Sequence, residues 1–388
     1  MRQDGTRQTV TPHSAASLSS TGVRAPHGKS AGTLIVDSDV HPKASEAFPL
    51  GPHIPDEIRE ALRQNLGGAP TTGYANPAGS ADRLDAECLD PHATARDHLD
   101  RYGITYAILQ SPGMQASVVN QIDVGTGIAT AWNRWQKQWL DADDRYRGSI
   151  CVNMNDPQGA IAEIERCAGD SRYVQVLASG EQRDLLGHRR YWPIYEAIAA
   201  AGLPFCLHPG QEGVNNSVTP IGRVGSYFEW HTLIPIVYQS HLVSLVLEGV
   251  FEKFPGLKVI LCEGGIFWAI HTTLRMDKNF KGLRSTAPWL KRRPSEYVWD
   301  HVRLTTQPLE EPDKGQDLVT LLEMVHADRT VMFATDFPHW DFDDPNRVFP
   351  KSMPDELKNR IFYDNAAELY GLPSREEVTA RQPEAVAA

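Results

Sequence analysis

The sequence predicts an α/β protein of one domain, a (β/α)8 TIM barrel with a long loop after its first strand. It contains eight short apolar runs of β-rich composition, and helical patterns alternate with them along the chain. Strict alternation of strand and helix indicates right-handed crossovers and a parallel sheet. Eight such units favour a closed barrel, and 388 residues is a length that barrels reach with insertions. No G-x-G-x-x-G follows the first run, which disfavours a Rossmann fold.

The elements follow one another regularly along the chain. The predicted strands cover residues 33–37, 104–110, 148–153, 173–178, 203–208, 257–263, 301–306 and 330–336. The predicted helices cover residues 91–103, 130–147, 156–169, 191–202, 234–256, 267–280, 315–328 and 354–371.

Two connections are unusually long, and the two ends of the chain lack an apolar pattern. Residues 42–90 are rich in Gly, Ala and Pro in their second half, and we expect them to cover the mouth of the barrel, with a disordered insertion as the alternative. Residues 209–231 are a second candidate wall of the mouth. The barrel is expected over residues 32–373, and composition predicts disordered tails over 1–31 and 374–388.

Composition narrows the class of partner. The net charge of −11, with no basic run beyond "LKRRP", argues against a nucleic-acid partner and favours a small molecule. No apolar stretch is long enough for a membrane span or a secretory signal. The five scattered cysteines indicate buried free thiols in a reducing compartment, so we expect a cytoplasmic protein.

Ionisable side chains gather at the predicted strand ends. "IVDSDVHP" provides Asp37, Asp39 and His41, and the fifth, sixth and eighth strands end on His208, Glu263 and Asp336. The carboxyl ends of parallel barrel strands open onto one face, where active sites are built. Residues at positions i and i+2 of a strand point the same way, as two ligands of one ion must. Two histidines and two carboxylates at one mouth therefore predict a site for a divalent metal such as Zn or Mn.

Each of these residues also has a structural interpretation. A strand-end aspartate such as Asp37 often caps a helix or a turn, and a lone His208 would more often be a hydrogen-bonded core histidine. Because the other candidates share one position at the mouth of the barrel, we favour a metal site for them together. Asp37 is expected to support that site or to have a structural role.

The chain resembles the amidohydrolase-related proteins of the group that contains aminocarboxymuconate semialdehyde decarboxylase and γ-resorcylate decarboxylase. The segments that carry the resemblance include "IVDSDVHP", "LPFCLHPG", "LKVILCEGGIFW", "VMFATDFPHWD" and "IFYDNAAELYGL". The resemblance implies a barrel with metal ligands Asp39, His41, His208 and Asp336. Many members have His where this chain has Asp39, and an oxygen ligand there shifts the preference towards Mn without excluding Zn. No strand-end Lys of the kind that bridges two metals is present, so the site is expected to be mononuclear.

The sixth strand also departs from the group. Its decarboxylases typically carry a histidine for proton transfer there, whereas "CEGG" places Glu263. Glu263 could act as acid and base or orient a ligand. His241, in the preceding helix, is the other candidate proton shuttle, with packing on the buried side of the helix as the alternative. The expected catalytic residues are therefore Asp336, His241 and Glu263.

The function expected from these features is decarboxylation of an aromatic or dienoic carboxylic acid with one divalent metal ion. The alternative is a metal-dependent hydrolase of an amide, lactone or ester, and a non-catalytic binding or scaffold barrel is a third hypothesis. Trp268, Phe337, His339 and Trp340 are expected to wall a flat apolar pocket, or else to pack between loop and helix, and Gln307 to face the substrate. The resemblance implies a homodimer.

Overall fold

The computed structural model describes residues 33–59, 88–210, 212 and 219–381. The chain divides into two units, Met1–Ala31 and Gly32–Ala388, and every described residue belongs to the second. The predicted N-terminal tail and most of the long connection over residues 42–90 lie outside the described residues, as do parts of the second candidate wall.

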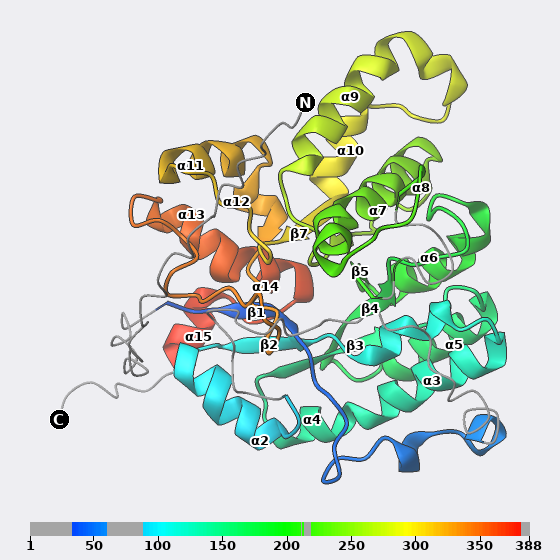
Figure 1. Ribbon diagram of the computed structural model, residues 1–388, viewed down its shortest axis with the longest axis vertical. Helices are drawn as coiled ribbons and strands as arrows, with labels where there is room; N and C mark the ends of the chain where they lie inside the picture. The colour runs from blue at the N-terminus through cyan, green and yellow to red at the C-terminus, as the bar shows by residue number, and fades with distance from the viewer. Residues whose placement is uncertain (1–32, 60–87, 211, 213–218, 382–388) are drawn as a thin grey trace, which may run out of the picture. The chain divides into compact units, whose positions relative to one another are not determined.

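Eight parallel strands form one sheet in the order of the chain, as predicted (Figure 1). They are β1 Val36–Val40, β2 Tyr106–Leu109, β3 Tyr146–Cys151, β4 Tyr173–Ser179, β5 Phe205–His208, β6 Val259–Leu261, β7 Val302–Thr305 and β8 Val331–Met332. The segment after β8 meets β1, because the Ser38 N–H donates to Phe333 O and the His41 N–H donates to Phe337 O. These bonds join the last strand to the first, which gives a (β/α)8 barrel.

Side chains alternate between two apolar layers along the strands. Phe205 and Leu207 of β5 belong to the larger cluster, which also contains apolar residues of the surrounding helices. Cys206 between them belongs to a smaller cluster with Ile260 and Met332 from other strands. The barrel therefore has a filled interior and an outer layer under the helices.

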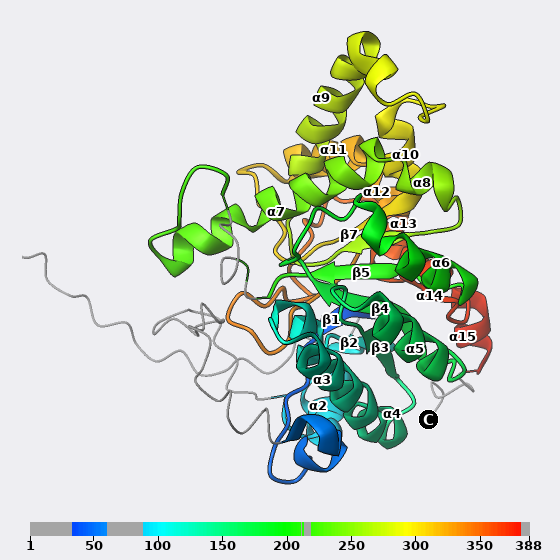
Figure 2. The ribbon, with the colours of Figure 1, turned by 90° about the vertical axis from the view of Figure 1, so that its right-hand side faces the viewer.

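The helices surround the sheet, and α3, α5 and α6 lie side by side outside the strands (Figure 2). Most begin near their predicted position. α3 and α7 begin earlier than predicted, and at the start of α7 the Ser226 side chain accepts a hydrogen bond from the Glu229 N–H. The helices are α2 Pro91–Thr94, α3 Ile122–Trp135, α4 Lys137–Ala142, α5 Pro157–Cys167, α6 Trp192–Ala200, α7 Tyr227–Leu247, α8 Val250–Lys253, α9 Trp268–Leu283, α10 Pro294–His301, α11 Gly315–Met324, α12 Ala327–Thr330, α13 Asp355–Asn359, α14 Asn365–Tyr370 and α15 Arg375–Arg381.

The strands differ from their predicted bounds by one to four residues, and the shifts in β1 and β8 are the largest. β1 runs to Val40 rather than ending at Asp37, because Val40 still pairs with Leu109 of β2. β8 contains only Val331 and Met332, because the Phe333 N–H donates to Ile361 O rather than to a neighbouring strand. Asp39 is therefore a strand residue, whereas Asp336 lies in the loop after its strand.

The prediction of a disordered tail from residue 374 is wrong for residues 375–381, which form α15. Arg375 ties this helix to the barrel through an ion pair with Asp364, and Val378 is buried. The charged, alanine-rich composition of residues 374–388 resembles that of a disordered tail, so the packing of α15 could not be predicted from it. Residues 382–388 lie outside the described residues.

All five cysteines are free and buried, as the sequence indicated. Within the described ranges, no helix is long and apolar enough to cross a bilayer.

Candidate metal centre

The strand ends bring buried carboxylates and imidazoles together at one place. Asp39, His41, His208 and Glu263 each offer a ligand atom, and these atoms lie within 4.8 Å of one another. A second group of His41, Asp336 and His339 shares His41 with the first. The side chains come from β1, β5 and the segments that follow β1, β6 and β8, so the fold collects them from five points of the chain.

Their closest atoms are spaced like neighbouring ligands of one ion. His41 Nε2 lies 2.9 Å from Asp39 Oδ1 and 2.9 Å from Asp336 Oδ1. His208 Nε2 lies 3.3 Å from Asp39 Oδ1 and 3.1 Å from Glu263 Oε2. Two ligands at about 2.1 Å from one ion, at tetrahedral or octahedral angles, lie about 3.0–3.4 Å apart. The observed spacing agrees with that value.

Several of the possible metal-ligand atoms accept or donate no hydrogen bond to the described part of the chain, so they remain available to bind an ion. Asp39 Oδ1, His41 Nε2, His208 Nε2 and both Glu263 oxygens are buried there without a hydrogen bond of acceptable geometry. Buried polar atoms are normally satisfied, so this concentration indicates a missing partner. His208 Nδ1 lies 2.7 Å from Pro209 O, which fixes the proton on Nδ1 and presents the lone pair of Nε2 to an ion. The residues present therefore fit a divalent cation.

Two of the carboxylates sit on unusual backbone. Glu263 has a φ of 55° and Asp336 a φ of 59°, in the left-handed region that residues with a side chain seldom adopt. Such a conformation costs on the order of 1–2 kcal/mol per residue. Strain of this kind concentrates at functional sites, and here both strained residues contribute a carboxylate to the same cluster.

The charges in the cluster shift one another's protonation. Burial alone would raise the pKa of Asp39, but the electrostatic and hydrogen-bond interactions with His208 and His41 outweigh burial and hold the pKa well below its usual range. Burial lowers the pKa of His41, and the carboxylates of Asp39 and Asp336 outweigh that effect and raise it to about 10. Burial and the neighbouring carboxylates, led by Asp336, raise the pKa of Glu263 well above the usual range. Without a cation, this site therefore favours proton uptake.

The expected ligand residues are brought together, with one addition. Asp39, His41 and His208 lie in the first group, and Asp336 joins through His41. Glu263, expected as a proton-transfer or orienting group, lies among the potential ligands themselves. Glu263 Oε2 lies 3.1 Å from His208 Nε2, and this contact could not be predicted from the sequence.

Asp37 has the structural role left open for it. Its carboxylate accepts hydrogen bonds from the N–H and the hydroxyl of Thr335 and from the Asp39 N–H. His98 Nε2 lies 2.7 Å from Asp37 Oδ2, the oxygen that also accepts from the Thr335 hydroxyl. Asp37 thus joins β1 to the loop after β8, and its hydrogen bonds favour the structural role over a place among the candidate metal ligands.

Asp39 is oriented from inside the barrel. The Cys262 thiol donates to Asp39 Oδ2 at 3.3 Å, which leaves Oδ1 directed at the histidines. The Thr305 hydroxyl and the Gln110 amide approach the same sulfur at 3.6 and 3.8 Å. The sequence showed Cys262 only as a buried thiol.

His241 does not reach this cluster. Its Nδ1 accepts from the Leu186 N–H at 3.3 Å, so its Nε2 carries the proton and donates to Gly180 O at 2.8 Å. Burial lowers its pKa to about 4. Both ring nitrogens are thus hydrogen-bonded to the backbone. His241 belongs to none of the clusters of possible metal ligands found in the described residues. The geometry favours the packing alternative over a proton shuttle.

The loop after β8 contributes more than its aspartate. His339 Nδ1 lies 2.6 Å from Asp336 Oδ1, and Gln307 Nε2 donates to Asp336 Oδ2 at 3.3 Å. Gln307, expected to face the substrate, therefore holds Asp336. His339, expected as an aromatic wall, touches the acid. The D-x-P-H spacing of "DFPHW" was the available signal, since a β-turn brings residues i and i+3 together, and here the His339 N–H donates to Asp336 O.

Of the other aromatic residues expected to wall the pocket, Phe337 is buried and the two tryptophans are partly exposed. Phe337 is buried and stacks on His98 at 4.2 Å, so it packs the loop against the barrel rather than lining a pocket. The Trp268 indole N–H donates to Gly265 O. The Trp340 indole N–H donates to the Tyr227 hydroxyl of α7 and stays partly exposed.

A further pair went unnoticed in the sequence. His231 Nε2, on α7, lies 3.1 Å from Asp341 Oδ2, and both form a third group with Glu263. His231 ends the stretch expected as a second wall, and only the fold shows that α7 meets the loop after β8.

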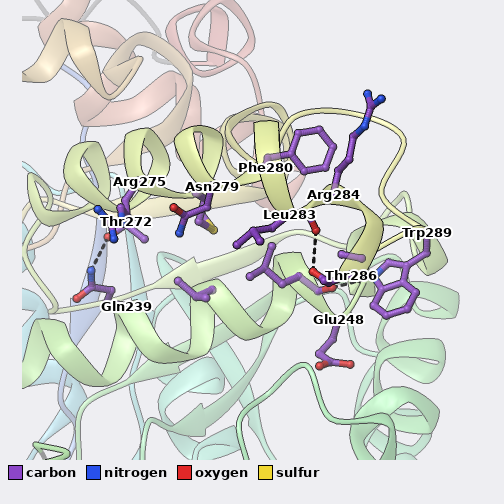
Figure 3. Close-up of a pocket in the computed structure, with 14 residues that line it drawn as sticks. Gln239, Glu248, Thr272, Arg275, Asn279, Phe280, Leu283, Arg284, Thr286 and Trp289 are labelled. Atoms are coloured by element: carbon purple, nitrogen blue, oxygen red, sulfur yellow. Dashed lines mark hydrogen bonds between the residues drawn. The ribbon is translucent and has the colours of Figure 1, made fainter.

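A separate hollow of about 330 Å³ lies between α7 and α9. Figure 3 shows Gln239 and Thr272 on its two sides, joined by a hydrogen bond of 3.0 Å. Its lining contains no member of the ionisable cluster found in the described residues. The candidate ligand residues therefore belong to a different part of the barrel from this hollow.

Most of the chain matches known proteins in sequence. A family model described as "Amidohydrolase" matches residues 36–372. A γ-resorcylate decarboxylase from a Polaromonas species is 26% identical over 289 residues, which cover 71% of this chain and 85% of that protein.

Solved structures share the fold. The 5-carboxyvanillate decarboxylase of Sphingomonas paucimobilis superposes with a TM-score of 0.65 at 21% identity, covering 88% of this chain and 99% of the other. The 5-carboxyvanillate decarboxylase of Novosphingobium aromaticivorans, solved with manganese and 4-hydroxy-3-methoxy-5-nitrobenzoic acid, gives 0.66 at 20% identity, covering 90% and 99%.

Proposed function

Because the chain belongs to the amidohydrolase family, we propose that it is a metal-dependent, non-oxidative decarboxylase of a hydroxylated aromatic carboxylic acid. The observation that carries the proposal is the convergence of Asp39, His41, His208, Glu263 and Asp336 at 2.9–3.3 Å spacing. The γ-resorcylate and 5-carboxyvanillate decarboxylases among the relatives and structural neighbours support the reaction class.

The proposed ligands are Asp39, His41, His208 and Asp336, with Glu263 as a fifth residue at the ion. Three carboxylates and two imidazoles make an oxygen-rich set, which suits Mn²⁺ better than a set of histidines alone would. The manganese bound in the Novosphingobium structure supports the same choice. Zn²⁺ is the alternative ion.

A divalent ion at this place supplies Lewis acidity and positive charge for the oxygens of an anionic substrate. The chain's own groups supply the proton. Asp336 is held by Gln307 on one oxygen and by His339 on the other, so its carboxyl is oriented before substrate arrives. We assign Asp336 the relay of a proton: it takes one from His339 and delivers it to the ring carbon as the bond from that carbon to CO2 breaks. Solvent then returns a proton to His339.

The reaction is tested by CO2 release. Purified protein loaded with Mn²⁺ is incubated with 2,6-dihydroxybenzoate, 5-carboxyvanillate and other hydroxybenzoates, and CO2 is measured with the decarboxylated product. The proposal expects release from at least one acid, abolished by a chelator and by Asp39→Ala. A parallel panel of lactones and amides covers the hydrolase alternative, which the replacement of histidine by Glu263 keeps open. Turnover only in that panel would replace decarboxylation with hydrolysis.

Two further properties belong to the proposal. Five buried free thiols support a cytoplasmic location, where cysteines stay reduced. A homodimer is the expected assembly, and light scattering after gel filtration measures it directly.

A further inference from the structure

The segment after β6 is held at its first peptide from two sides. The Tyr238 hydroxyl of α7 donates to Cys262 O at 2.6 Å, and the Glu263 N–H donates to the Thr305 hydroxyl oxygen at 3.0 Å. These two backbone groups belong to one planar peptide unit, so its orientation is fixed. Gly264 comes next, and a Cβ there would overlap the Tyr238 ring. Glu263 therefore takes its left-handed backbone conformation between an anchor on α7 and an anchor on β7.

The Thr305 hydroxyl also reaches a second carboxylate, through a thiol. It donates to Cys262 Sγ at 3.6 Å, and the Cys262 thiol donates to Asp39 Oδ2 at 3.3 Å. The Glu263 N–H, the hydroxyl and the thiol thus donate in one direction, towards the carboxylate of Asp39. Hydrogen bonds in such a chain polarise one another inside a protein. This chain begins at one proposed metal-binding residue and ends at another.

The members of the chain are shielded from solvent. Asp39, Cys262 and Thr305 have no exposed surface, and Glu263 is 1% exposed. A donor or acceptor lost from a buried position leaves its partner unsatisfied, because water does not replace it there. Thr305 is the last residue of β7 and pairs with Met332 of β8, and its β-branched side chain has few rotamers. The sheet itself therefore aims the hydroxyl.

A buried threonine often serves the fold alone. The Thr273 hydroxyl is an example, since it donates to Ala269 O within its own helix α9. Thr305 differs because both partners of its hydroxyl lead to the proposed metal centre. Holding Asp39 Oδ2 leaves Oδ1 facing the histidines, and holding the Glu263 backbone brings its carboxylate to 3.1 Å from an imidazole nitrogen.

We propose that Thr305 is a positioning residue of the metal centre, whose hydroxyl holds the backbone of Glu263 and, through the Cys262 thiol, the rotation of the Asp39 carboxylate. The inference rests on the proposed function, because it takes Asp39 and Glu263 as residues at the ion. Losing the hydroxyl releases both carboxylates together. Its contribution therefore belongs to the affinity for the ion as well as to the stability of the fold.

Calorimetric titration of the chelator-stripped full chain with Mn²⁺ measures this role without reference to activity. Thr305→Val removes the hydroxyl and keeps the branched shape of the side chain, and Thr305→Ser restores a hydroxyl. Thr273→Val is the matched control, because Thr273 is also buried and belongs to none of the clusters of possible metal ligands in the described residues. Circular dichroism checks that each variant folds, and Thr305→Ala replaces Thr305→Val if that variant does not.

The proposal expects Thr305→Val, or Thr305→Ala in its place, to weaken Mn²⁺ binding by about tenfold or more, the usual effect of losing a group that orients a ligand. Thr305→Ser and Thr273→Val should bind within about threefold of the wild type, because both keep the Thr305 position's hydroxyl. In a Cys262→Ala background, Thr305→Val should weaken binding by a smaller factor than in the wild type, because the chain is already broken at the thiol.

A folded Thr305→Val that binds Mn²⁺ as tightly as the wild type would overturn the positioning role, and so would a Thr305→Ser that binds as weakly as Thr305→Val. An equal loss with and without Cys262→Ala would remove the connection through the thiol. These results would leave the proposed decarboxylation standing, because CO2 release by the wild type tests it separately. A wild type that binds Mn²⁺ and releases no CO2 would overturn the decarboxylation and leave the role of Thr305 intact.

Discussion

The Cys262 thiol donates a hydrogen bond to Oδ2 of Asp39 across 3.3 Å, inside the barrel and beneath the proposed metal centre. Burial raises the pKa of Cys262 well above its usual range, so the sulfur keeps its proton and remains a donor. Oδ1, the other oxygen of Asp39, faces both His41 and His208. The thiol thereby selects which oxygen of the carboxylate is offered to an ion.

Replacing Cys262 by Ala is expected to weaken Mn²⁺ binding by about tenfold or more, because groups that orient a ligand typically contribute roughly 10–100-fold to metal affinity. Cys262→Ser keeps a donor and is expected to bind nearly as tightly as the wild type. Calorimetric titration measures both. Cys167→Ala is the matched control, since Cys167 is equally a buried thiol but packs in the outer apolar layer. Equal affinities for Cys262→Ala and Cys167→Ala would refute the orienting role.

Glu263→Gln should change stability in opposite directions with and without metal. In the metal-free protein the pKa of Glu263 is raised by burial and by Asp336, so its ionised form destabilises the fold at neutral pH. Removing the charge is expected to raise the melting temperature of the metal-free protein by about 2 °C or more. In saturating Mn²⁺ the variant should melt below the wild type, because it lacks a ligand. Calorimetric scans with chelator and with Mn²⁺ decide this, and the same sign in both would count against Glu263 as a ligand.

His241 should make the unfolding free energy depend on pH. Burial lowers its pKa to about 4 in the folded chain from an ordinary value of 6.5, so the unfolded chain takes up a proton first as the pH falls. The stability that His241 contributes is present above about pH 6.5 and is lost as the pH falls towards 4, by about 2 kcal/mol between about pH 7 and pH 5. Denaturant unfolding of metal-free wild type and His241→Gln measures the difference. A wild type and a variant that lose equal stability over this range would contradict the buried neutral histidine.

The sequence predicted the parts of this molecule that depend on local patterns. Apolar runs alternating with helical patterns were enough for eight parallel strands, and the i and i+2 spacing placed Asp39 and His41 on one side of β1. Position at a strand end was likewise enough to mark His208 and Asp336 as candidate ligands, because the carboxyl ends of barrel strands share one face.

Contacts between distant segments could not be read in this way. Glu263 meets His208 only because β6 follows β5 in the barrel and its backbone adopts a left-handed conformation. His231 meets Asp341 because α7 packs beside the loop after β8. His241 had the residue type of a proton shuttle, and only the structure shows that its ring nitrogens face the backbone of Gly180 and Leu186, which favours the packing alternative.

Asp336 and His241 can be separated by kinetics. Asp336→Asn is expected to lower kcat by about 100-fold or more, the usual cost of losing a proton-transfer group. His241→Gln should keep kcat within about tenfold at neutral pH, because both of its ring nitrogens are bonded to backbone. Steady-state CO2 release measures both, with Asp355→Asn as the exposed control for an aspartate substitution. A large loss in His241→Gln with a folded spectrum would restore His241 as a shuttle.

Anomalous diffraction at the manganese edge, from crystals grown with Mn²⁺, tests the metal centre most directly. We predict a peak bonded to Asp39 Oδ1, His41 Nε2 and His208 Nε2, and no peak at that position in crystals of His208→Ala. An empty site between those three atoms, in crystals saturated with manganese, would contradict the proposed centre.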